Sequence, residues 1–426
     1  ELAVNVTDKR LYTENNAGAI VELGTNPASA VTMASTLAVT GNVDFNGDLD
    51  VDGTSNLDVI DVDGAANFAA DVTFADGADI ITASAGTSNF RAGVNAGNSI
   101  ASGGNYNVVV GDEAGTAITT GDYNTAVGYE AGDAITTGVS NTFMGGRAGT
   151  ATTTASYNTA VGERSFQTNT TGANNVVMGW AAMTANTTGA ENTALGRSAL
   201  ASNTTASNNT AVGYTALVAN TTGTRNSAMG ATALDANTEG NYNSAFGYNS
   251  LGANTTGTHN TALGDFSQAA NTTGTKNVSV GQGSFISNTT GSNNTVVGTE
   301  ALDQNTTASN NTAVGFQSLK ANTTGASNTA VGYSAVAANT TGIQNTSIGG
   351  FSLASNTTAA GNTAIGFGTL YTNTTGASNT AVGLNALNLS TTASNNTAVG
   401  MSALIANTTG DRNVAVGTEA LDANTT

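Results

Sequence analysis

A five-residue block in which apolar and polar positions alternate recurs along most of this chain of 426 residues. Its commonest form is Asn-Thr-Ala-Val-Gly, and nineteen copies follow one another from residue 107 to residue 417 at a constant spacing of 17 residues. No insertion or deletion interrupts the series. Because a period of two is typical of a half-buried β-strand, each block predicts one short strand.

Two positions of the block are invariant. Each block ends at a glycine, which we call the repeat glycine: Gly111, Gly128, Gly145, Gly162, Gly179, Gly196, Gly213, Gly230, Gly247, Gly264, Gly281, Gly298, Gly315, Gly332, Gly349, Gly366, Gly383, Gly400 and Gly417. Four residues before each glycine lies an asparagine: Asn107, Asn124, Asn141, Asn158, Asn175, Asn192, Asn209, Asn226, Asn243, Asn260, Asn277, Asn294, Asn311, Asn328, Asn345, Asn362, Asn379, Asn396 and Asn413. The residue directly before each repeat glycine is always apolar.

The remainder of the unit predicts how one coil closes. After the glycine the commonest sequence continues as Tyr-x-Ala-Leu-x-Ala, for which we expect a second short strand. Asn-Thr-Thr-Gly then predicts a turn, because Asn forms Asx-turns and Gly accepts a positive φ. The sequence therefore predicts an all-β fold, a repetitive parallel β-solenoid (β-roll) with 17-residue coils. In this fold the asparagine column forms an amide ladder and the glycine column marks a bend.

Residues 1–104 do not follow the repeat. Between residues 9 and 24, two segments flank Asn15-Asn16-Ala17-Gly18, which predicts a β-hairpin. From residue 37 on, glycines at 41, 47 and 53 separate short alternating segments. We therefore expect three parts: a hairpin and attachment segment over 1–36, a short-strand β-shaft over 37–104, and nineteen β-roll repeats over 105–426.

Composition narrows the possible chemistry. Without any Cys the chain has no disulfide, no thiolate nucleophile and no Cys-based zinc site. The net charge of −19 is opposite to what a nucleic-acid-binding protein needs. No apolar run approaches the roughly 18 residues that a membrane span requires, and the first residues do not resemble a signal peptide. We expect no enzyme, no cofactor, no metal site, no nucleic-acid partner and no membrane insertion.

Three local motifs are interpreted as structural. The segment from Asp48 to Gly53 resembles the start of a calcium-binding loop, but Val59 stands where the bidentate glutamate is needed. We therefore interpret it as a strand with one acidic face. The single histidine, His259, is expected on the surface at a turn. The Asn-Thr-Thr runs match the glycosylation sequon and are interpreted as turn chemistry.

Aromatic residues follow the repeat glycine in seven copies: Tyr129, Trp180, Tyr214, Tyr248, Phe316, Tyr333 and Phe367. Such a stripe could bind a carbohydrate. We favour a partly covered packing column, because other copies carry Arg197 or Asp265 at this position. The stacked Thr residues could also form an ice-binding face, but the Thr pairs fall at a predicted turn and not on a strand.

Two families resemble parts of the chain. The Asn-Thr-Ala-Val-Gly units over 105–426 resemble the head repeats of trimeric autotransporter adhesins, which carry a similar Ser-Val-Ala-Ile-Gly pentapeptide and form trimers of left-handed parallel β-rolls. The present unit differs in its constant 17-residue length and its Asn-Thr-Thr-Gly turns. Residues 4–12 and 20–24 resemble segments of marine bacteriophage tail fibres. Residues 39–53 are similar to the short trimeric β-shaft repeats of such fibres.

These resemblances imply a structural fibre. We expect the shaft of a homotrimeric phage tail fibre, located in the virion tail and joined to other tail or fibre subunits. A tip outside this chain is expected to bind the host surface receptor. The alternative is a bacterial trimeric adhesin head at the cell surface. A polysaccharide-degrading β-helix is less favoured, because acidic residues form no column across adjacent coils. An ice-binding β-helix is less favoured because the Thr pairs fall at the predicted turn.

Each unit carries two columns of large apolar residues. One lies directly before every repeat glycine and the other lies, in most copies, four residues after it. One narrow coil cannot enclose both columns, so one of them must be buried against other chains. We predict that the column before the glycine, for example Val314, lies on a threefold axis.

Overall fold

The computed structural model describes residues 2–5, 10–14, 17–18, 20–24 and 84–425. The chain divides into two units, Glu1–Asp76 and Gly77–Thr426. In the first unit, β1 (Leu2–Asn5), β2 (Arg10–Glu14) and β3 (Ile20–Gly24) form an antiparallel sheet. Strands β2 and β3 coincide with the two segments that predict a hairpin. The calcium-loop-like segment at 48–53, and the predicted shaft as far as residue 83, lie outside the described residues.

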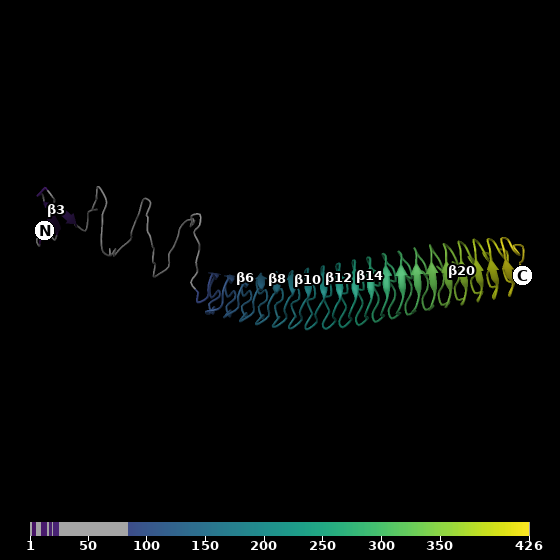
Figure 1. Ribbon diagram of the computed structural model, residues 1–426, viewed down its shortest axis with the longest axis horizontal. Coiled ribbons are helices and arrows are strands. Elements are labelled where there is room, and N and C mark those ends of the chain that lie inside the picture. The colour runs from purple at the N-terminus through teal and green to yellow at the C-terminus, as the bar shows by residue number, and fades with distance from the viewer. Residues whose placement is uncertain (1, 6–9, 15–16, 19, 25–83, 426) are drawn as a thin grey trace. The chain divides into compact units, whose positions relative to one another are not determined.

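The second unit is a parallel β-solenoid with one three-residue strand per coil (Figure 1). The strands are β4 (Phe90–Ala92), β5 (Val108–Val110), β6 (Thr125–Val127), β7 (Thr142–Met144), β8 (Thr159–Val161), β9 (Val176–Met178), β10 (Thr193–Leu195), β11 (Thr210–Val212), β12 (Ser227–Met229), β13 (Ser244–Phe246), β14 (Thr261–Leu263), β15 (Val278–Val280), β16 (Thr295–Val297), β17 (Thr312–Val314), β18 (Thr329–Val331), β19 (Thr346–Ile348), β20 (Thr363–Ile365), β21 (Thr380–Val382), β22 (Thr397–Val399) and β23 (Val414–Val416). The predicted all-β solenoid with 17-residue coils is confirmed.

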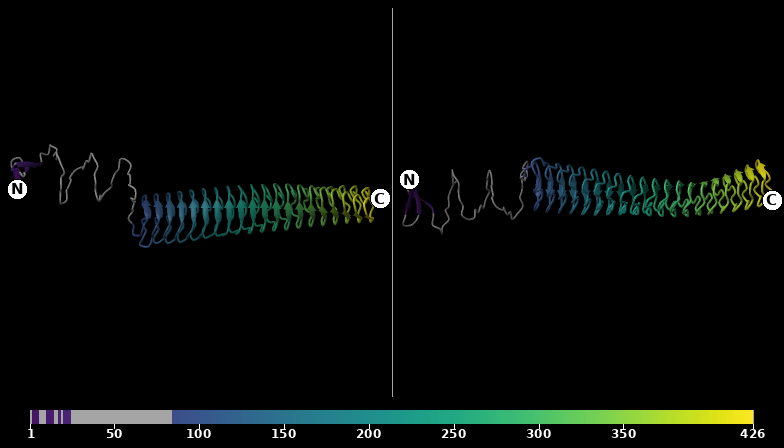
Figure 2. Two further views of the ribbon diagram at one scale, coloured as in Figure 1. Left: turned by 45° about the horizontal axis from the view of Figure 1, so that its top comes forward. Right: turned by 90° about the horizontal axis from the view of Figure 1, so that it is seen from below.

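Each strand of the solenoid pairs in parallel with the strand of the next coil (Figure 2). The pairing is in register, so that Thr312 lies beside Thr329 and Val314 beside Val331. Constant coil length is the cause, because every residue meets its equivalent one coil away. The first coil, which carries β4, was not apparent in the repeat because Gly93 precedes Gly111 by 18 residues and not by 17.

The expectation of a second strand after the repeat glycine is wrong. This half of the coil consists of turns, because the residues two and four positions after the glycine have positive φ. In one coil these are Thr215 and Leu217, both at φ 52°. A strand cannot contain such residues. The turns still hydrogen-bond between coils, since the amide of Leu217 donates to the carbonyl of Ala233 at 3.0 Å.

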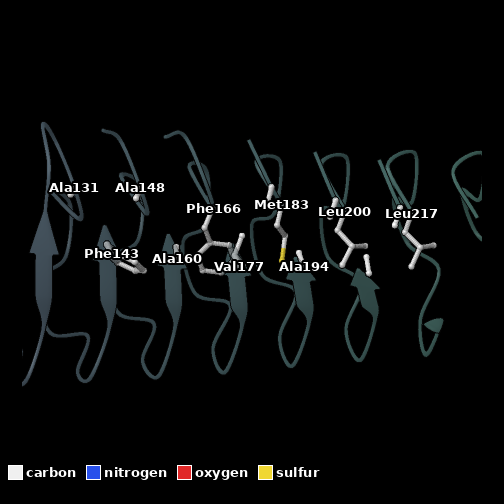
Figure 3. Packing of buried hydrophobic residues seen from close by; sticks show 14 of the residues in the cluster. Ala131, Phe143, Ala148, Ala160, Phe166, Val177, Met183, Ala194, Leu200 and Leu217 are labelled. Atoms are coloured by element: carbon white, nitrogen blue, oxygen red, sulfur yellow. The ribbon is translucent and has the colours of Figure 1, made fainter. Parts of the chain in front are cut away.

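Apolar side chains fill the interior, most of them Ala and Leu, with single large rings such as Phe143 and Phe166 (Figure 3). The middle residue of the strand, such as Ala194, points inward together with the Ala or Ser three residues after the repeat glycine and the Leu four residues after it. Leu200 and Leu217 are fully buried. The apolar column four residues after the glycine is therefore the inner one of the two columns.

The first repeat coils fill the same interior with different residues. Gly115, Gly132 and Gly149 replace the buried Leu column. Ile135 and Phe143 occupy the vacated space, because a Cβ built on Gly132 would lie 2.8 Å from Cδ1 of Ile135 and 2.9 Å from Cδ2 of Phe143. The interior volume is thus conserved while its residues change, as close packing requires.

Candidate functional site

The invariant asparagines form a continuous buried ladder. In all nineteen copies the backbone amide donates a hydrogen bond to Oδ1 of the preceding asparagine of the ladder, at 2.8–3.1 Å. Asn124 shows the full pattern, since its Nδ2 also donates to Oδ1 of Asn107 at 3.2 Å and to the carbonyl of Gly138 at 2.9 Å. The ladder begins one coil earlier than the repeat, at Asn89.

A second asparagine ladder runs beside the first and was missed in the sequence. It consists of the Asn of the Asn-Thr-Thr-Gly turn, seven residues after the repeat glycine. Asn186 donates from Nδ2 to Oδ1 of Asn169 at 2.8 Å and to the carbonyl of Gly189 at 3.0 Å. The sequence predicts the turn at this asparagine but not its stacking between coils. The signal for stacking is that the asparagine recurs at the same position of most coils.

Burial of the second ladder bears on the glycosylation sequons. Asn186 has no exposed surface, and its Nδ2 is used in two hydrogen bonds. The sequon Asn186-Thr187-Thr188 is therefore closed to modification in the folded chain. The interpretation of these runs as turn chemistry agrees with this geometry.

The repeat glycines adopt a backbone that only glycine tolerates without strain. All nineteen have φ between 127° and 140°. A Cβ on Gly281 would lie 2.7 Å from the carbonyl carbon of Gly298. The glycine is thus required both by its dihedral angle and by the close approach of the next coil.

The outward face of the strands carries two columns that extend along the solenoid. The first and third strand residues point outward, and neither position holds a charged residue in any of the nineteen copies. The third position, directly before the repeat glycine, is always apolar. Its members are partly exposed: Val314 is half-buried, Leu263 is 49% exposed, and Val416 in the last coil is 71% exposed. This outer apolar column, as we call it, is a stripe of apolar surface along the solenoid.

The seven aromatic residues after the repeat glycine are exposed, and several touch neighbours one coil away. Phe316 stacks on Tyr333 with ring centroids 5.6 Å apart. Arg197, which interrupts the aromatic column, lies over Trp180 at 5.0 Å and over Tyr214 at 5.8 Å. The guanidinium therefore continues the stack in place of a ring.

His259 is exposed at a turn and stacks on Tyr242, with ring centroids 4.8 Å apart. Among the residues that the structure describes, no group of three or more His, Asp or Glu could hold a metal ion. Burial raises the pKa of three aspartates at one position of the coil, five residues after the repeat glycine: Asp133, Asp235 and Asp303. They belong to separate coils and assemble no reactive pair.

No family model matches this chain, and comparison with curated proteins and with solved structures finds no match either. Within the described ranges, no helix is long and apolar enough to cross a membrane. The fold and its surfaces are therefore the basis for a functional proposal.

Proposed function

We propose that this chain forms the rigid shaft of a homotrimeric fibre of a phage tail, which positions a receptor-binding tip for adhesion to the host. The observation that carries the proposal is the outer apolar column, which is apolar in all nineteen copies and partly exposed. Stacked coils spaced by about 4.8 Å extend this column over about 90 Å. The apolar area of a stripe of this length exceeds the few hundred Å² of continuous apolar surface that is usual on a soluble monomer.

Parallel association in register covers this stripe most simply. Each apolar residue then meets its own copies around a common axis, so that Val314 packs against Val314 of the other chains. The absence of charge from both outward strand positions removes electrostatic repulsion between these acidic chains at the contact. The number three rests on the resemblance to trimeric fibres and adhesin heads.

A fibre shaft acts mechanically, and the fold suits that role. The first amide ladder and in-register pairing join every coil to the next, and the second ladder joins most of them. The nineteen repeats carry no inserted loop. Binding and catalytic loops of repeat proteins usually occur as insertions on one face. We therefore propose a structural role without catalysis.

The absence of native cysteine gives a clean test by cross-linking. We expect the single-cysteine variant Val314→Cys to form covalent dimers under mild oxidation, because two of three thiols on an axis can join. The matched variant Thr324→Cys, in an exposed column at the turn, should remain uncross-linked. Equal cross-linking of the two variants, or none in Val314→Cys, would contradict assembly through this column. Antibodies against the chain should label virion tails; labelling of bacterial surfaces alone would favour the adhesin head.

A further inference from the structure

One coil departs from the consensus sequence, and a hollow opens on its surface. Two positions after the repeat glycine, most coils carry a side chain, but Gly368 has none. A cavity of about 340 Å³ lies there, lined by Phe351, Phe367, Gly368, Tyr371, Asn385 and Asn388. These residues come from three consecutive coils and from the turn half of each coil, not from the outward strand face. The hollow is therefore separate from the outer apolar column.

Aromatic rings form the walls of this hollow. Phe351 meets Phe367 edge to face with centroids 5.8 Å apart, and meets Tyr371 in the same way at 6.2 Å. Phe367 is 56% exposed and Tyr371 is 41% exposed. Mutual packing holds the rings in place while parts of their surfaces stay open to a ligand.

Two asparagine amides provide the polar groups. A Cβ at position 368 would lie 2.5 Å from Oδ1 of Asn385, so the missing side chain leaves room at this acceptor. Oδ1 of Asn385 also accepts a long hydrogen bond of 3.4 Å from Nδ2 of Asn388 and has a second lone pair for a ligand. Asn388 donates from Nδ2 to the carbonyl of Gly368 at 2.6 Å, which fixes its amide beside the hollow. An Asn amide can both donate and accept, as a ligand with several hydroxyl groups requires.

The absence of charged residues around the hollow indicates which ligands it can bind. Residues 321–410 contain no Asp, Glu, Lys, Arg or His. By contrast, the hollow lined by Tyr129, Arg147, Glu163 and Arg164 is charged. A site without charge has no counter-ion for a phosphate, a sulfate or a sugar acid, because a buried charge without a partner is unfavourable.

We propose that this hollow binds a neutral pyranose ring of a saccharide. The C–H face of a pyranose packs on an aromatic surface, and its hydroxyl groups pair with the amides of Asn385 and Asn388. Small-ligand sites commonly combine an apolar aromatic lining with a few placed polar groups. The proposal does not depend on the oligomeric state of the chain.

Saturation-transfer NMR on the full chain tests the proposal, with D-glucose, D-galactose and N-acetyl-D-glucosamine as separate probes. We expect transfer to the ring C–H protons of at least one sugar, and loss of that transfer in Gly368→Asn. Asn249 and Asn385 already occupy this position of the coil at φ 52° and 54°, so the variant is compatible with the coil. Gly283→Asn is the matched control, because Gly283 has the same position and φ 60° in another coil and open space beside it.

A second pair of variants tests the rings. Tyr371→Ala should abolish transfer, whereas Tyr214→Ala, in the exposed aromatic column outside the hollow, should retain it. Thermal melting of each variant shows that the coil is folded. The proposal is wrong if none of the three sugars receives saturation, or if transfer persists undiminished in Gly368→Asn and Tyr371→Ala.

Discussion

Asn209 and Asn220 donate from Nδ2 to the same acceptor, the carbonyl oxygen of Gly223, each at 2.9 Å. Asn209 belongs to the first ladder and Asn220 to the second. Their shared acceptor joins the strand side of the coil to its turn side, and the same pattern recurs in neighbouring coils, for example at Gly240. The two ladders therefore form one connected network of amides, and loss of one member leaves buried partners without a donor or an acceptor.

Asn260 tests the first ladder. It is fully buried, its amide and Nδ2 donate to Oδ1 of Asn243 and to the carbonyl of Gly274, and its Oδ1 accepts from the amide of Asn277. We predict that Asn260→Ala lowers the free energy of unfolding by about 1–3 kcal/mol, because these partners stay buried and unpaired. Asn260→Asp should cost more, since it places a carboxylate oxygen against the Gly274 carbonyl. Denaturant titration gives both values.

Thr256→Ala is the control for these variants, because Thr256 lies exposed at the turn of the same region. Its effect should be close to zero. If Asn260→Asp melts at the same temperature as the unmodified chain, the ladder does not contribute to stability.

Ser390 interrupts the second ladder. It stands where other coils have asparagine, and within the described residues both its Oγ and Oδ1 of Asn373 are buried without a hydrogen-bond partner. We predict that Ser390→Asn raises the free energy of unfolding by about 1 kcal/mol, because its Nδ2 supplies the missing donor. A rise in melting temperature checks this. An unchanged or lower value would show that the break is not a defect.

Gly281 and Gly283 separate two requirements for glycine within one coil. Gly281 has φ 133° and no room for a Cβ, whereas Gly283 has φ 60° and nothing within 4 Å of a Cβ. We predict that Gly281→Ala destabilises the chain by more than the ~1–3 kcal/mol expected of backbone strain alone. Gly283→Ala should cost about 1 kcal/mol, the penalty for Ala in a left-handed conformation. Similar melting temperatures for the two variants would contradict the close approach between coils.

Asp235 makes stability depend on pH. Burial raises its pKa above the ordinary value of 3.8. Its favourable contribution is therefore complete below pH 3.8 and is lost as the pH rises through the higher pKa of the folded chain. We predict that Asp235→Asn raises the melting temperature at pH 7 and changes it little at pH 3. Glu239→Gln, which removes a charge from an exposed residue of the same coil, controls for net charge.

Much of the coil could be predicted from the sequence, because constant spacing fixes register without further information. The strand over Thr312–Val314 and the stacking of Asn260 on its equivalents both follow from the 17-residue period. The conformation of the residues directly after the repeat glycine could not be predicted. Leu217 has a positive φ, which nothing in a leucine side chain indicates, and the bonds between coils stabilise that conformation.

The surfaces were predictable to different degrees. The repeat predicts that one of the two apolar columns lies outside the coil and favours the column before the glycine; in the structure Leu217 is buried and Val212 faces outward, half-buried. The hollow beside Gly368 depends on three coils and on the absence of one side chain. The sequence alone does not show which side chains of the neighbouring coils surround this glycine.

The outer apolar column is the centre of this account, and its most direct test is the mass of the chain in non-denaturing solution. Sedimentation equilibrium should give three times the 41.9 kDa of one chain. Val314→Asp, which places a charge in the column, should shift the equilibrium toward smaller species, whereas Thr324→Asp at the exposed turn should not. A stable monomer of 41.9 kDa at micromolar concentration would contradict assembly through this column and the fibre built on it.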